Sequence, residues 1–122
     1  MAAVKHSEEG QLTVDVYRDG DSIVIESAIG GIDPDSDLHV NIKRDVVEIR
    51  GERRREKEVK EEDYYYQECF WGAFSRTIIL PEEIDPDSSG ADFKNGMLTV
   101  RMPIAKKKKG KKVKVSSHKG AG

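Results

Sequence analysis

The residue types that could do nucleophilic, acid–base or metal chemistry are few and scattered along this chain. The three histidines, His6, His39 and His118, are far apart in the sequence, so their spacing indicates no clustered metal site. The single cysteine, Cys69, has no neighbouring histidine or lysine to activate its thiol, and we expect a half-buried small side chain rather than a nucleophile. No glycine-rich phosphate loop opens a helix. We therefore expect neither an enzyme nor a bound cofactor.

Charge is the stronger chemical signal. After Asp92 the chain has ten basic and no acidic residues, whereas the preceding part has eleven basic and 23 acidic ones. Such a division indicates a tail that contacts another molecule, either the acidic body of a neighbour or a nucleic acid. Seven lysines lie within residues 106–114, and no aromatic side chain stands between them. Any nucleic-acid binding would therefore be unspecific, and a solubilising tail is the simpler interpretation.

Length and composition indicate one soluble globular domain. The chain has 122 residues, of which 36% are charged and 36% hydrophobic. No apolar run approaches the roughly 20 residues of a membrane span, and residues 1–11 lack the apolar region of a secretory signal. One cysteine excludes an internal disulfide, so a reduced, cytoplasmic setting is the expected location.

Alternating apolar and polar residues predict short antiparallel strands that would position these groups. Turn residues separate the strands every 8–12 residues, as in an all-β antiparallel β-sandwich. Asp19-Gly20 and Asn95-Gly96 supply the tight turns of two hairpins. The alternation predicts seven or eight strands, namely two within 12–28, then 38–42, 46–51, 74–80, 91–93 and 98–102.

The segment 52–63 is strongly charged and allows two interpretations. It could form a helix with ion pairs between residues four apart. Only Val59 is apolar, however, so no helical face could pack against a core. We favour a solvated loop.

Arg76 falls on the inward face of its predicted strand, in register with Phe74, Ile78 and Leu80. A guanidinium on an apolar face costs several kcal/mol unless it finds a partner. Either Arg76 lies at an open edge and reaches water, or this face meets a second subunit that offers a carboxylate. The spacing does not rank these two explanations.

Four segments together resemble the small heat-shock proteins, which carry an α-crystallin domain. GERRREKEVKEEDYYYQE (51–68) is similar to the charged loop of the bacterial and plant type, and FSRTIILP (74–81) to the motif F-x-R-x-x-x-L-P. FKNGMLTVRMP (93–103) is similar to the signature F-x-N-G-x-L-T-V-x-x-P, and VKV (113–115) to the tail motif of two Ile or Val residues separated by one. The resemblance covers roughly residues 11–115.

This resemblance implies that the sandwich is immunoglobulin-like and that it forms a dimer and larger assemblies. In similar proteins a strand of the long loop pairs with an edge strand of the partner, and the arginine matched by Arg76 lies at or near that contact. The tail motif, here Val113 and Val115, docks across subunits into a groove between two edge strands. Carried over, the crossing segment comprises Tyr64, Tyr65, Tyr66, Gln67 and Glu68, and the groove comprises Leu38, Val40, Ile42, Ala91 and Phe93.

The resemblance also suggests three regions: a short polar arm (1–10), an α-crystallin domain (11–104) and a flexible extension (105–122). The family's arm is usually several tens of apolar-rich residues, so the short arm here predicts small oligomers and weaker client binding. Three further departures are Ile29-Gly30-Gly31 in place of Leu-Pro-Gly, Ser89 in place of isoleucine, and Cys69 in place of arginine.

The function implied is an ATP-independent chaperone, a holdase that binds partly unfolded proteins and limits their aggregation during stress. Its expected partners are further copies of itself and client proteins, with no membrane. Two alternatives remain: a co-chaperone of the p23/CS type, which shares the sandwich but lacks a V-x-V tail, and a weak nucleic-acid binder acting through the lysines.

Overall fold

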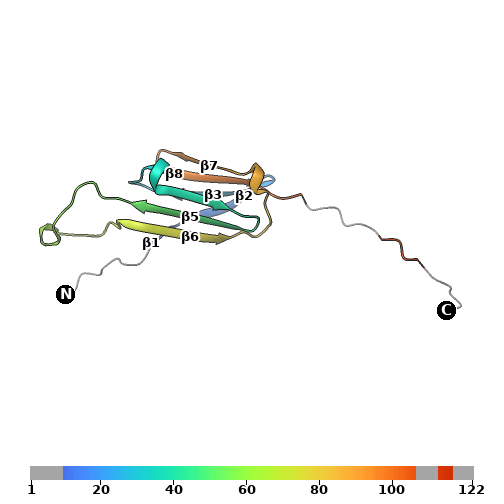
Figure 1. Cartoon of the computed structure of the whole chain (residues 1–122), viewed down its shortest axis with the longest axis horizontal. Coiled ribbons are helices and arrows are strands. Elements are labelled where there is room, and N and C mark those ends of the chain that lie inside the picture. Colours follow the sequence, from blue (N-terminus) through green and yellow to red (C-terminus); the bar gives the residue numbers. More distant parts are fainter. Residues whose placement is uncertain (1–9, 107–112, 117–122) are drawn as a thin grey trace.

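Two four-stranded sheets pack into a sandwich, which confirms the predicted fold class (Figure 1). The computed structural model of the chain describes residues 10–106 and 113–116. The first sheet contains, in order across it, β1 (Gly10–Gln11), β6 (Gly72–Ile79), β5 (Val46–Arg53) and β4 (Leu38–Ile42). The second contains β2 (Asp15–Asp19), β3 (Ser22–Ala28), β8 (Met97–Pro103) and β7 (Gly90–Lys94). Neighbouring strands are antiparallel, except that β1 pairs with β6 in parallel.

The core lies between the inward faces of the two sheets. Residues in register on paired strands share a face, so Ile25 and Val100 lie together in one sheet and Val47 and Ile78 in the other. All four are buried. The rest of the core follows the same period of two along each strand or lies in the connections, and comprises Leu12, Ile23, Ile29, Ile49, Phe74, Leu80, Ile84, Leu98 and Met102.

The predicted hairpin turns are confirmed by backbone geometry. Gly20 between β2 and β3 has φ +59°, and Asn95 and Gly96 between β7 and β8 have φ 52° and 76°. Positive φ is costly for most residues, but glycine adopts it freely and asparagine tolerates it. These turns help to fix the strand register. The core fixes it as well, because a slip of one residue would turn each core side chain to solvent.

The sequence Ile-Asp-Pro-Asp-Ser occurs twice, at 32–36 and 84–88, and builds the same structure both times. Each copy forms a single helical turn, α1 (Pro34–Asp37) or η2 (Pro86–Ser88). In the first, Oδ1 of Asp33 accepts the main-chain N–H two residues on, at 3.1 Å. In the second, Asp85 does the same, also at 3.1 Å. A proline at the first helical position and an aspartate before it are the usual start of a helix.

The first predicted strand begins later than its alternating pattern suggested. Leu12 was expected in this strand, but the regular pairing of β2 starts at Asp15. Residues 12–14 instead connect β1 in one sheet to β2 in the other, and Leu12 is buried during this crossing. A buried crossing segment and a half-buried strand leave similar apolar patterns, so the spacing alone could not separate them.

The charged segment 52–63 is a loop with short ordered ends, as we favoured. Glu52 and Arg53 extend β5, and a single 3-10 turn, η1 (Glu61–Asp63), precedes Tyr64. We call residues 54–71 the long loop. It projects beyond one end of the sandwich, at the end opposite the C-terminal segment (Figure 1).

Candidate functional site

The long loop carries the most exposed aromatic side chains of the described residues. Tyr65 is 98% exposed and Tyr66 is 86% exposed. Gln67 and Glu68 are also exposed, whereas Tyr64 is half-buried. The predicted crossing segment belongs to no helix or strand and presents Tyr65 and Tyr66 to solvent. Apolar groups held in water in this way favour contact with another molecule.

One expectation in this loop was wrong. Cys69 was expected to be half-buried, but the structure places it on the surface as a free thiol. Cys69 belongs to no strand and lies on the returning limb of the long loop, three residues before β6 begins at Gly72.

Three consecutive arginines hold the base of the long loop. The first, Arg53, donates from Nε to the carbonyl of Gly30 at 2.8 Å and from Nη1 to the carbonyl of Phe70 at 3.3 Å. Its guanidinium also lies 5.9 Å from the ring centroid of Phe74. Arg53 thereby ties the outgoing strand to the returning limb of the loop and to the turn after β3.

The second arginine binds a buried carboxylate. Arg54 donates from Nε to Oδ1 of Asp37 at 3.0 Å, and its Nη2 lies 3.6 Å from Oε2 of Glu52. The side chain of Asp37 is only 7% exposed, and its second oxygen accepts the main-chain N–H of Asp33 at 3.4 Å. A buried carboxylate is tolerable when it is paired and hydrogen-bonded in this way. The pair fixes α1 to the base of the loop.

The third arginine lies between the two limbs of the loop. Arg55 donates from Nη1 to the hydroxyl of Tyr64 at 2.6 Å. The centre of its guanidinium lies 5.3 Å from the ring centroid of Tyr64 and 5.2 Å from that of Trp71. The sequence showed these arginines only as part of a charged run. The aromatic residues Tyr64, Phe70 and Trp71 that follow later in the same loop were the available signal.

Arg76 has a partner that neither sequence-based explanation named. It lies on the same face of β6 as Phe74 and Ile78, as its register predicted. Within the chain, its Nη1 donates to the main-chain carbonyl of Leu12 at 3.1 Å. Residues 12–14, which connect the two sheets, thus supply the acceptor that the guanidinium needs.

The predicted groove residues lie on the outermost strands of the two sheets. Val40 and Ile42 of β4 pair with Ile49 and Val47 of β5, so they share the core face. With Leu38 and Phe93 they are partly buried and packed against the core. Ala91 of β7 pairs with Val100, on the core face of the other sheet, but it is exposed. The inward rims of both outer strands are therefore apolar.

The two valines of the tail motif are not packed against the rim of their own subunit. Val113 is 73% exposed and Val115 is 89% exposed. The segment 113–116 lies well away from the sandwich (Figure 1). Residues 1–9 of the predicted arm (1–10), and residues 107–112 and 117–122 of the predicted extension, lie outside the described residues.

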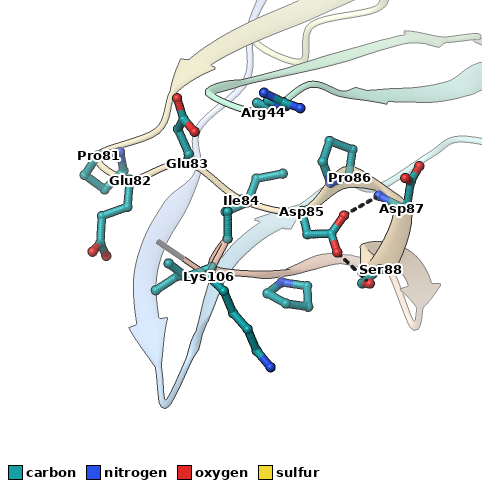
Figure 2. A pocket seen from close by; sticks show the side chains of 13 residues that line it. Arg44, Pro81, Glu82, Glu83, Ile84, Asp85, Pro86, Asp87, Ser88 and Lys106 are labelled. Atoms are coloured by element: carbon teal, nitrogen blue, oxygen red, sulfur yellow. Dashed lines mark hydrogen bonds between the residues drawn. The ribbon is translucent and has the colours of Figure 1, made fainter. Parts of the chain in front are cut away.

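Several carboxylates line the pocket near the end of β8 (Figure 2). Two of them, Asp85 and Glu82, are already engaged by partners within the chain. This pocket has a volume of about 1020 Å³. Asp85 accepts from the main chain of Asp87 and from Oγ of Ser88, while Glu82 pairs with Arg18 at 3.3 Å. In residues 10–106 and 113–116, no group of three or more His, Cys, Asp or Glu side chains is arranged to hold a metal ion.

One titratable group on the outer face of the second sheet departs from its ordinary behaviour. The hydroxyl of Tyr17 on β2 donates to Oε1 of Glu26 on β3. This hydrogen bond, together with the negative charge of Glu26, raises the pKa of Tyr17 above its ordinary value of 10.0.

Comparison with known proteins gives this arrangement a family. A model of the Hsp20/alpha crystallin family matches residues 15–116. The chain belongs to this family of small heat-shock proteins. This Hsp20 family member is 35% identical over 97 residues to spore protein SP21 of Stigmatella aurantiaca, covering 80% of the chain and 57% of SP21. It is also 35% identical over 109 residues to the 18 kDa antigen 1 of Mycobacterium intracellulare, covering 89% and 71% of the two chains.

Solved structures of the family have the same fold. Heat shock protein 16.0 from Schizosaccharomyces pombe superposes with a TM-score of 0.70 at 32% identity, covering 89% of this chain and all of that one. A small heat-shock protein from Xylella fastidiosa, described as having a distinct high-order structure, gives 0.69 at 26% identity, covering 87% and 96%. The Hsp20 family member spans little more than half the length of SP21. None of its described helices is long and apolar enough to cross a membrane.

Proposed function

We propose that this small heat-shock protein is an ATP-independent holdase of the cytoplasm that binds partly unfolded proteins and limits their aggregation. The observation that carries the proposal is the exposure of Tyr65 and Tyr66 on a projecting loop whose base is firmly held. Membership of the family supports it. The proposed activity needs no enzyme chemistry and no cofactor.

The working unit in this proposal is a homodimer. The segment Tyr64–Glu68 of one subunit would pair with an open edge strand of the other. β2 is the outermost strand of its sheet, and all five of its side chains are exposed. Main-chain hydrogen bonds across such an edge would satisfy unpaired N–H and C=O groups on both chains. Arg76 is hydrogen-bonded to Leu12 within its own chain. In this proposal Arg76 therefore lies near the dimer contact but does not pair with the second subunit.

Larger assemblies would use the tail. Val113 and Val115 lie two residues apart, so an extended tail turns both to the same side. In a neighbouring subunit they would cover the rim formed by Leu38, Val40, Ile42, Ala91 and Phe93, which are also candidate client contacts. Burial of two valines contributes about 3 kcal/mol before ordering costs, a weak contact that becomes useful when it is repeated in an assembly.

The test is light scattering of a heat-labile client protein, without nucleotide and at equal subunit concentration. We expect the wild-type chain to suppress the rise in scattering. The double variant Tyr65→Ser with Tyr66→Ser should suppress it less, because it removes both exposed rings. Ile79→Ser is the matched control, since Ile79 is 82% exposed on the sandwich, away from the loop. No suppression by the wild type would refute the holdase proposal.

The two alternatives give different outcomes. A co-chaperone of the p23/CS type would form a stable complex with an ATP-dependent chaperone, and the family match favours the small heat-shock protein over it. A nucleic-acid binder would retard DNA or RNA in a gel shift at physiological salt. We expect neither result.

A further inference from the structure

The guanidinium of Arg55 joins the two limbs of the long loop through three contacts. It is bonded to the hydroxyl of Tyr64, where the crossing segment begins, and it faces the rings of both Tyr64 and Trp71. Trp71 immediately precedes β6 and so belongs to the returning limb. Arg53 and Arg54 instead bind Gly30, Phe70 and Asp37 at the base of the loop. Of the three arginines, Arg55 alone reaches Tyr64.

The indole of Trp71 lies under the guanidinium of Arg55 and beside Gly31. Its Nε1–H is buried and has no hydrogen-bond partner among the described residues. A buried tryptophan usually fixes its ring with that donor. Here the flat face of Arg55, 5.2 Å from the ring centroid, supplies the contact that holds the ring.

Holding both limbs has a consequence for the segment that follows Tyr64. Tyr65 and Tyr66 are 98% and 86% exposed, and folding back onto the sandwich would lower the free energy of the chain by burying their rings. Arg55 fixes the residue just before them, and the loop therefore leaves its base in a set direction, with Tyr65 and Tyr66 held outward. Fixing this direction before association reduces the ordering cost that a second copy would otherwise have to offset.

We propose that Arg55 is a positioning residue that presents the segment Tyr64–Glu68 to the edge strand of a second copy of this chain. This inference rests on the dimer of the proposed function and adds the residue that prepares it. Lysine cannot replace arginine here, because an ammonium group has no flat face to lie against one ring while it donates to the hydroxyl of another.

The test compares Arg55→Lys with Arg50→Lys. Arg50 is an exposed arginine of β5 that pairs with Glu48 at 2.8 Å on the sheet surface, so its replacement controls for loss of a guanidinium. We would measure the dimer dissociation constant by analytical ultracentrifugation and the thermal midpoint in parallel. Arg55→Lys should weaken the dimer about tenfold with little change in the midpoint. Arg50→Lys should leave the dissociation constant within about twofold.

A second readout follows the loop itself. The chain has one tryptophan, so near-ultraviolet circular dichroism and fluorescence above 300 nm report on Trp71. Arg55→Lys should reduce the asymmetric signal of the indole, and Tyr64→Phe, which keeps the ring but loses the hydroxyl, should reduce it only in part.

The outcomes separate this inference from the proposal beneath it. A wild-type chain that stays monomeric would overturn the dimer and the role of Arg55 together. A dimeric wild type whose dissociation constant and indole signal are both unchanged in Arg55→Lys would overturn only the role of Arg55. Equal weakening by Arg55→Lys and Arg50→Lys would also overturn it, because the loss of a guanidinium anywhere on the surface would then explain the effect.

Discussion

Arg76 donates a hydrogen bond to the main-chain carbonyl of Leu12, although 64 residues separate them in the sequence. This contact joins the inward face of β6 to the segment that crosses between the two sheets. It satisfies a guanidinium that would otherwise be costly on an apolar face. It also anchors residues 12–14 beside the short parallel pair of β1 and β6.

Replacing Arg76 by alanine should therefore loosen residues 12–14, which connect the two sheets, more than the strands of the sandwich. A hydrogen bond from a charged donor typically contributes about 1.5–3 kcal/mol, and partial exposure of Arg76 puts the expected loss near 1 kcal/mol. Amide hydrogen exchange should become faster at residues 10–14 and remain slow in β5. Equal acceleration in both regions would contradict the assigned role.

Gly51 lies where a larger residue has no room. A Cβ atom at this position would lie 2.3 Å from the ring of Phe74 and 2.7 Å from the carbonyl oxygen of Asp37. Gly51→Ala should destabilise the fold by about 1–3 kcal/mol, because the ring and the backbone must both shift. Gly90→Ala is the control, since a Cβ there meets nothing within 4 Å. Denaturant midpoints of the two variants measure the difference, and similar midpoints would refute the steric reason.

Asp37 is expected to be the most sensitive carboxylate of its turn. Its replacement by alanine leaves the main-chain N–H of Asp33 without this acceptor, and it leaves Arg54 with only the longer ion pair to Glu52. We expect a loss of about 1–3 kcal/mol in the free energy of unfolding. Asp35→Ala, which removes an exposed carboxylate two residues earlier, should change it by less than about 0.5 kcal/mol. A thermal melt of both proteins distinguishes them.

Tyr17 gives the fold a dependence on alkaline pH. Its pKa is raised in the folded chain by the hydrogen bond to Glu26. The protonated phenol is therefore favoured by folding, so its contribution to stability is complete below the ordinary value of 10.0 and is lost as pH rises through the folded pKa. Tyr17→Phe should abolish this part of the pH profile. Spectroscopic titration at 295 nm would show one tyrosine ionising later than the others, and four coincident titrations would contradict the prediction.

The tail valines should govern assembly size rather than folding. Replacing Val113 and Val115 by serine removes two exposed methyl-bearing groups that make no core contact. The thermal midpoint should stay within about 1 °C, since surface substitutions change stability little. Multi-angle light scattering should show smaller oligomers than the wild type. Lys114→Ser, which leaves both valines in place, is the control, and equal oligomer sizes in all three proteins would rule out tail docking.

Much of the fold could be predicted because its information is local. The alternation in Leu98, Val100 and Met102 fixes both a strand and its buried face, and Asn95-Gly96 fixes the turn before it. The contacts at the base of the loop could not be predicted in the same way. Arg54 meets Asp37 only because β4 and β5 pair in one register, so each partner looks like an ordinary surface charge in the sequence.

The site was predictable in part. The exposure of Tyr65 and Tyr66 agrees with a segment reserved for contact, and the partly buried Val40 and Ile42 agree with an apolar rim. The place of Leu12 in the segment that crosses between the sheets, and its bond to Arg76, were missed because such a segment has no periodic signature. The exposure of Cys69 was missed because the lack of an activating His or Lys argues against a nucleophile but says nothing about burial.

The linked charges Glu52, Arg54 and Asp37 also respond to heat differently from the apolar core. Hydration of charged groups becomes less favourable as temperature rises, so the cost of removing Asp37 from water falls. Apolar burial shows no comparable gain over the same range. The base of the loop is therefore expected to lose cohesion more slowly on warming than an apolar contact of equal strength would. We expect the loop of such a chain to stay anchored at temperatures at which a loop held by apolar contacts alone would loosen.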